Sequence, residues 1–146
     1  MNVITSNMHP RRVARECVLE ALFAHQYNKD IPSLIINRAI NNDSLRKENK
    51  EFIELLFNFV VENKDATDEI IQSHLQNWEF DRIAQIDRLL IKMGICEIFF
   101  INEIPPKVSI TEMVEISKIY STDDSPVFIN GILDAVYKEY QKEDRG

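Results

Sequence analysis

Apolar residues recur with the period of an α-helix along almost the whole chain, and this pattern limits the possible folds more than any other feature. About seven segments carry stripes at i, i+3, i+4 and i+7: residues 10–26, 32–40, 45–63, 70–78, 82–101, 109–120 and 128–140. Glycine, which all-β folds use heavily in their turns, occurs only three times in 146 residues. The sequence therefore predicts an all-α fold.

The segment at 82–101 is apolar on most of its circumference, which is typical of a central, buried helix. Two prolines, Pro105 and Pro106, end it. Ser109 and Glu112 then have the spacing of a capping box, in which a serine hydroxyl and a glutamate three residues later satisfy the first backbone amides of a helix. We therefore expect the next helix to begin with Ser109 as its N-cap.

Asn130 and Gly131 lie between apolar residues, a combination that favours a β-hairpin turn. The helical stripe nevertheless continues through both residues without alternation. We predict a helix here, with Gly131 allowing a close helix contact at an expense of about 1 kcal/mol relative to alanine.

Several function classes are excluded by what the sequence lacks. No apolar run reaches the roughly 18 residues that a membrane span needs, and residues 1–10 lack the apolar region of a secretory signal. Neither GxGxxG nor GxxxxGK[ST] occurs, so the common nucleotide cradles are absent. Cys17 and Cys96 have neither zinc-ligand nor disulfide spacing. We expect a cytoplasmic protein without a metal or cofactor.

The residues that usually carry catalysis are few and scattered. His25 and His74 each follow a glutamate by five residues, which is not the same-face spacing of a metal site. Both cysteines lie on apolar stripes, where an inert buried thiol is the ordinary case. We therefore expect a protein that is not an enzyme, and the chemistry that remains is that of binding.

The net charge of −7 argues against a general nucleic-acid binder, but the charge is unevenly distributed. Residues 1–15 contain three arginines and no acid, whereas residues 62–81 carry a net charge of −5. Such a chain can contact two partners of opposite charge. Ordinary solvated helix faces are the alternative interpretation.

Three arginines open the first helix, where positive side chains meet the positive end of the helix dipole. Arg11 and Arg15 are one turn apart, with Arg12 beside them. This unfavourable placement indicates an anionic partner, because guanidinium groups bind phosphate bidentately. Single-stranded RNA also needs aromatic faces for stacking. Tyr120 and Phe128, which flank the last connection, offer such faces unless both belong to the core.

Two parts of the sequence together resemble one family. The first is Arg11–Glu16 with the apolar helix that follows it. The second is a C-terminal series: Ile86–Leu90, Pro106–Glu112, Ser117-Lys118, Tyr120, Asp124-Ser125 and the fairly specific Phe-Ile-Asn-Gly-Ile-Leu-Asp at 128–134. Over about residues 9–140 this pattern resembles the NusB family of bacterial transcription antitermination factors.

The resemblance implies a fold and a function that composition does not show. The fold would be two stacked three-helix bundles, at about residues 9–76 and 81–140, in one NusB-like helical domain. The function would be non-enzymatic: such proteins pair with NusE, a small-subunit ribosomal protein, bind the boxA element of nascent rRNA, and join other Nus factors on RNA polymerase in the bacterial cytoplasm.

Matching positions imply two sets of site residues. The RNA-binding set is Arg11, Arg12, Arg15, Lys92, Lys118, Tyr120, Asp124 and Phe128. The set that faces NusE is Phe23, Asp81 and Asp87. Val13 stands where many relatives have another arginine, so RNA affinity is expected to be weaker. Asp124 would repel phosphate, and its carboxylate could instead accept a hydrogen bond from a base amino group or cap a helix.

Three alternatives remain open at this level. Some RNA cytosine methyltransferases begin with a NusB-like domain, but this chain lacks the methyl-donor domain with its glycine motifs and catalytic cysteines, and its charged tail resembles a natural end. A helical protein–protein adaptor without RNA binding is the second alternative. A homodimer that hides the arginines is the third.

Overall fold

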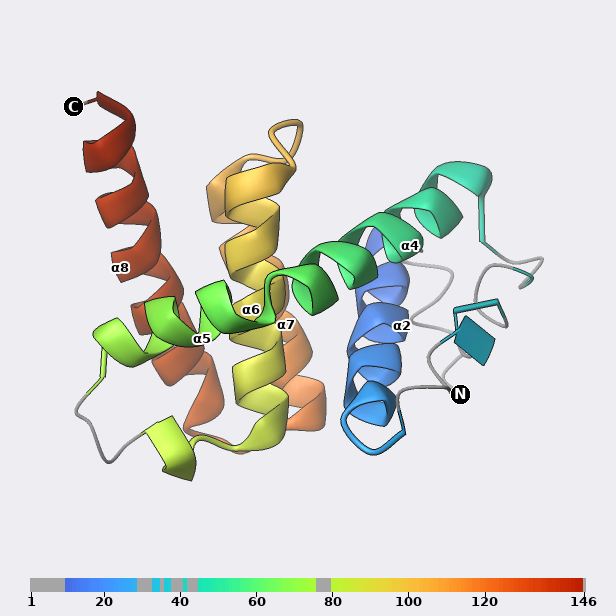
Figure 1. Ribbon diagram of the computed structural model, residues 1–146, viewed down its shortest axis with the longest axis horizontal. Coiled ribbons are helices and arrows are strands. Elements are labelled where there is room, and N and C mark those ends of the chain that lie inside the picture. Colours follow the sequence, from blue (N-terminus) through green and yellow to red (C-terminus); the bar gives the residue numbers. More distant parts are fainter. Residues whose placement is uncertain are drawn as a thin grey trace. The chain divides into compact units, whose positions relative to one another are not determined.

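The computed structural model describes residues 10–28, 33–34, 36–37, 41, 45–75 and 80–145, and the regular structure in these ranges is entirely helical (Figure 1). The helices are α2 (Pro10–His25), α4 (Lys47–Glu62), α5 (Lys64–Ser73), α6 (Gln85–Phe100), α7 (Pro106–Tyr120) and α8 (Ser125–Arg145), with a 3-10 turn, η1, at Phe80–Arg82. The all-α prediction is confirmed. The short helix predicted at 32–40 lies mostly outside the described residues.

The chain forms two compact units, residues 1–61 and 62–146. In the first unit, both α2 and α4 carry buried apolar side chains, such as Val18 and Leu22 in α2 and Ile53 and Leu56 in α4. The ring of His25 also meets the ring of Phe57 edge-on, with 5.9 Å between centroids. The sequence assigned the segment that follows α4 to the first bundle, whereas the structure puts α5 in the second unit.

The second unit is built around α6, which packs against α5, α7 and α8 (Figure 1). Every residue from 89 to 98 is buried, and Leu90, Ile91 and Met93 are completely inaccessible to solvent. A helix surrounded by three others must be apolar on all sides, so the prediction of a central buried helix is confirmed. This helix is the scaffold from which the site described below is built.

The capping box predicted at Ser109 is wrong. Helix α7 begins at Pro106, and Ser109 lies inside its first turn with no exposed surface. A proline at the first helical position has a suitable φ and lacks an N–H that would have no partner there. The Ser109 hydroxyl instead donates a 2.7 Å hydrogen bond to Glu97 Oε1. Glu97 is also fully buried, and a buried carboxyl group without a hydrogen bond is costly. The Ser109 hydroxyl therefore pairs with Glu97 and does not cap the helix.

The predicted role of Gly131 is also wrong, although the helix through it is confirmed. A Cβ atom on Gly131 would meet nothing within 4 Å, so no close contact requires this glycine. The close contact occurs at Gly94 in α6, where a Cβ atom would lie 2.6 Å and 2.8 Å from the two terminal carbons of Leu133. Leu133 is completely buried and has little room to move.

These two glycines form a matched pair for a stability test. Gly94→Ala is expected to lower the free energy of unfolding by about 1.5 kcal/mol, because the added methyl group overpacks the contact with Leu133. Gly131→Ala is expected to raise it by about 0.5–1 kcal/mol, because alanine has the better helix propensity and the site is open. Urea denaturation followed by circular dichroism measures both. Equal effects of the two substitutions would contradict this assignment.

Candidate nucleic-acid interface

The arginines at the start of α2 are docked against α4. The Arg11 Nε donates a 2.7 Å hydrogen bond to Asn49 Oδ1, and its guanidinium lies 4.2 Å from the centre of the Phe52 ring. The Arg15 guanidinium lies 5.2 Å from the same ring, and Arg15 is only 2% exposed. Arg12 is half-buried. Of the three predicted phosphate ligands, Arg15 is therefore buried against α4 and does not face solvent.

A groove of about 450 Å³ opens in the second unit and contains several of the predicted residues. Its lining comes from η1 and the residues after it, the first turn of α6, and the turn between α7 and α8. The lining residues are Arg82, Ile83, Ala84, Asp87, Thr122, Asp124, Ser125 and Phe128. The groove thus joins Asp124 and Phe128 of the predicted RNA-binding set to Asp87 of the predicted NusE-facing set. Arg82 was not singled out from the sequence, although it begins the helical segment predicted at 82–101.

Asp87 has a different setting from the one expected of a residue that faces a partner. It is 6% exposed, and its two carboxylate oxygens accept hydrogen bonds from Ser121 Oγ at 2.6 Å and Ser125 Oγ at 2.8 Å. Ser125 is the first residue of α8 and is 1% exposed. The carboxylate therefore connects the start of α6 to the turn between α7 and α8.

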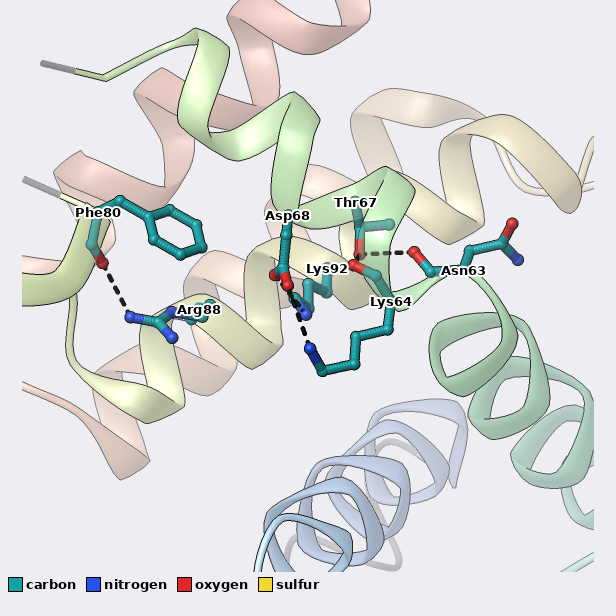
Figure 2. Close-up of polar contacts among 7 residues, drawn as sticks. All are labelled: Asn63, Lys64, Thr67, Asp68, Phe80, Arg88 and Lys92. Carbon is teal, nitrogen blue, oxygen red and sulfur yellow. Dashed lines mark hydrogen bonds and ion pairs between the residues drawn. The ribbon is translucent and has the colours of Figure 1, made fainter. Parts of the chain in front are cut away.

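The next residue, Arg88, contacts Phe80 (Figure 2). Its Nη2 donates a 2.8 Å hydrogen bond to the Phe80 carbonyl oxygen, and its guanidinium lies 4.6 Å from the centre of the Phe80 ring. Because Phe80 begins η1, this contact fixes the segment that carries Arg82. Asp81, the remaining acid of the predicted NusE-facing set, belongs to the same turn, but its side chain lies outside the described residues.

Lys92 forms an ion pair within the protein. Its Nζ lies 2.6 Å from Asp68 Oδ1 of α5, and its side chain is only 8% exposed (Figure 2). Lys64 approaches the other oxygen of Asp68, at 3.5 Å. The pair connects α5 to α6, so Lys92 does not present its ammonium group to solvent as a phosphate ligand would.

The end of α7 presents predicted RNA-binding residues at the surface. Tyr120 is 47% exposed, and Lys118 is exposed while forming a 2.6 Å ion pair with Glu115. Asp124 is exposed, and Phe128 is half-buried at the groove. Tyr120 is therefore not a core residue, which was the alternative interpretation of its position. This part of the second unit thus exposes a lysine, an aspartate and a tyrosine, and the Phe128 ring lines the groove.

An aromatic pair is exposed at the end of α2. Phe23, predicted to face NusE, is 38% exposed, and its ring lies 5.4 Å from that of Tyr27, which is 66% exposed. Tyr27 was not predicted from the sequence as a site residue. Helix α2 ends at His25, and Tyr27 lies in the turn that follows. Its spacing of i+4 from Phe23 is a signal that could have found it, because residues four apart at a helix end can still meet. Exposed aromatic pairs of this kind are frequent in protein–protein interfaces.

Residues 12–138 match the NusB family model. The chain belongs to the NusB family. It is 39% identical over 134 residues to "Transcription antitermination protein NusB" from Chloroherpeton thalassium, covering 91% of this chain but only 64% of that relative. Among solved structures, NusB from T. maritima is 33% identical with a TM-score of 0.78, covering 89% of this chain and 92% of that one. A chain in the crystal structure of antitermination factors NusB and NusE in complex with dsRNA is 25% identical with a TM-score of 0.77, covering 91% of this chain and 99% of that one.

Three further features describe this NusB-family chain. Among residues 10–28, 45–75, 80–145 and the few others that the structure describes, no three His, Cys, Asp or Glu side chains are grouped to hold a metal ion. Burial raises the pKa of the Cys96 thiol to about 12, and burial together with Glu20 and Glu16 raises that of Cys17 to about 11. Neither cysteine therefore forms the reactive thiolate at neutral pH. In the same part of the chain, no helix has the length and apolar character of a membrane span.

Proposed function

We propose that this chain is a non-enzymatic, RNA-binding transcription antitermination factor of the bacterial cytoplasm. In this proposal it binds boxA of nascent rRNA together with NusE and then joins the RNA polymerase antitermination complex. The observation that carries the proposal is the likeness to a chain solved in complex with dsRNA and NusE, which extends over 91% of this sequence.

The geometry supports a division of work among the proposed RNA-binding residues. Phe128 and Tyr120 stack on unpaired bases, since single-stranded RNA is recognised through its exposed base faces. Arg11, Arg12 and Lys118 contact phosphates. Arg15 and Lys92, which are buried in contacts within the chain, support these surfaces without touching RNA.

NusE is proposed to bind the end of α2 and the turn after it, where Phe23 and Tyr27 form an aromatic pair. The acidic stretch at residues 62–81 suits a basic ribosomal protein, because charge complementarity accelerates association and favours the correct partner. Asp81 belongs to this stretch. Association with NusE should therefore become slower as the salt concentration rises.

The test is fluorescence anisotropy of a labelled boxA-type RNA with the purified protein, with and without NusE. A scrambled RNA of the same length serves as the control. Tighter, sequence-dependent binding in the presence of NusE is expected. A folded protein that binds NusE but neither RNA would instead be an adaptor without RNA binding. Sedimentation of the same samples detects a homodimer that covers the arginines.

Arg12 and Arg15 should differ in their effects when each is replaced by alanine. Arg12→Ala is expected to weaken RNA binding by about 1 kcal/mol, roughly fivefold. If one phosphate contact is lost, it should also reduce the salt slope by about 0.7. Arg15→Ala is expected to lower the free energy of unfolding by about 1.5 kcal/mol, because the buried contact with Phe52 is lost.

Anisotropy at several salt concentrations and urea denaturation provide the two readouts for both variants. An Arg15→Ala protein with wild-type stability would contradict its assignment as a structural residue. An Arg12→Ala protein with an unchanged salt slope would remove Arg12 from the phosphate contacts.

A further inference from the structure

We infer that Asp87 and Arg88, adjacent residues in the first turn of α6, are positioning residues that hold the two walls of the groove in the arrangement that binds RNA. That the ligand is RNA rests on the proposed function. The contacts themselves do not depend on the ligand: Asp87 holds the turn between α7 and α8, and Arg88 holds η1.

The first wall is held by a closed network of hydrogen bonds. Ser121, at the C-cap of α7, and Ser125, at the start of α8, both donate to the Asp87 carboxylate. The two serine Oγ atoms lie 2.9 Å apart, and the backbone N–H of Thr122 donates to Ser125 Oγ at 3.2 Å. Both ends of this short connection are thus tied to one buried anion, which also fixes where α8 begins and hence where Phe128 lies.

The second wall is held through the main chain. Arg88 donates to the Phe80 carbonyl oxygen and covers the Phe80 ring (Figure 2). The Ile83 N–H, which donates to the same carbonyl oxygen at 3.4 Å, closes the turn. Arg82 and Ile83 of this turn line the groove together with Asp124 and Phe128. Moving either wall would change the width of the groove.

A carboxylate that acts only through its charge and a carboxylate that positions the groove predict opposite effects on RNA binding when they are removed. This difference makes the inference testable. A carboxylate beside an RNA site repels phosphate, so removing a carboxylate that contributes only charge should strengthen binding. Removing a carboxylate that holds the wall should weaken binding. Asp124 lines the same groove but is exposed, so it reports the effect of charge and serves as the matched control.

The experiment measures boxA-type RNA binding by anisotropy, with NusE present, for Asp87→Ala, Asp87→Asn and Asp124→Ala. We expect Asp87→Ala to weaken binding roughly tenfold. Asp124→Ala is expected to strengthen binding, roughly threefold. Asp87→Asn should stay within about threefold of wild type, because the amide can accept from one serine and donate to the other. Asp87→Ala binding as tightly as wild type, or more tightly, would overturn the inference.

A second measurement on the free protein does not depend on RNA. Hydrogen–deuterium exchange should be faster in Asp87→Ala than in wild type for the segment 121–128, and faster in Arg88→Met for the segment 80–84. The centre of α6 should be unchanged in both variants. Unchanged exchange in these segments overturns the inference.

These two readouts separate the inference from the proposed function. If wild type binds no RNA, the proposed function fails and the exchange data alone decide the positioning role. If Asp87→Ala does not fold, Ser121→Ala replaces it, since it removes one donor from the same network. Ser121→Ala is expected to weaken RNA binding roughly threefold and to accelerate exchange at 121–128; wild-type values in both assays would overturn the inference.

Discussion

Asp68→Ala is expected to lower the free energy of unfolding by about 3 kcal/mol, the largest stability effect that we predict for a single substitution. The Lys92 ammonium lies 2.6 Å from the Asp68 carboxylate, and the Lys92 side chain is only 8% exposed. Removing the carboxylate leaves a buried positive charge without its main partner. The reverse change should be milder: Lys92→Met retains the apolar stem, and Asp68 is 25% exposed and still close to Lys64. We expect a loss of about 1 kcal/mol for it.

Urea denaturation at pH 7, followed by circular dichroism, measures both substitutions. The control is Asp134→Ala, which removes the acid of an ion pair of similar length, 2.9 Å to Lys138, whose side chains are 47% and 69% exposed. An exposed pair contributes about 0–1 kcal/mol, so this control should change stability little. If Asp68→Ala were no more destabilising than Asp134→Ala, burial of the Lys92 charge would not govern the stability of the second unit.

The positions of the helices were predictable from the sequence, because the helical period of apolar residues can be recognised from neighbouring residues alone. The segment at 82–101 shows this most clearly: its apolar residues surround the helix, and α6 is buried over residues 89–98. The sequence also placed a helix through Asn130 and Gly131 against a strong turn signal. A helical stripe sustained over twelve residues outweighed one dipeptide, because each further turn adds buried surface.

The hydrogen-bond partners of buried polar side chains were not predictable, because these partners are distant in the sequence. Ser109 has the local pattern of a helix cap, but its partner Glu97 precedes it by 12 residues. Ser125 is 38 residues from Asp87. A periodic pattern indicates which face is buried, but it does not identify which acid or base meets a given polar group there. Lys92 was placed in the RNA-binding set by the family resemblance, and its ion pair with Asp68, 24 residues earlier, could not be read from the sequence.

The candidate site was predictable in part for a related reason. Asp124 and Phe128 were named from the sequence, and both line the groove. Arg82 was missed because η1 brings it to the groove through a contact of Arg88 with a backbone carbonyl, which has no sequence signature. The contact of Arg11 and Arg15 with the Phe52 ring of α4 was not predicted either, because Phe52 lies far from both arginines in the sequence.

Phe128→Ala is expected to produce the largest loss of RNA affinity among the single substitutions in the groove, about 2 kcal/mol or roughly 30-fold. Phe128 is a half-buried aromatic residue that lines the groove, and its ring offers a flat face on which an unpaired base can stack. The proposed stacking contact would be lost completely in the alanine variant. Because base stacking involves no phosphate, the salt slope of binding should stay the same as in wild type.

Truncating a half-buried ring also removes packing, so two further substitutions separate stacking from stability. Phe128→Leu retains most of the apolar volume but has no aromatic face, and we expect it to lose most of the RNA affinity while unfolding near the wild-type urea midpoint. Phe128→Tyr retains the face and should bind RNA within about twofold of wild type. Anisotropy in the presence of NusE measures all three variants. Wild-type affinity in Phe128→Leu would mean that Phe128 shapes the groove by its volume and that the stacking platform lies elsewhere, with the exposed ring of Tyr120 as the next residue to replace.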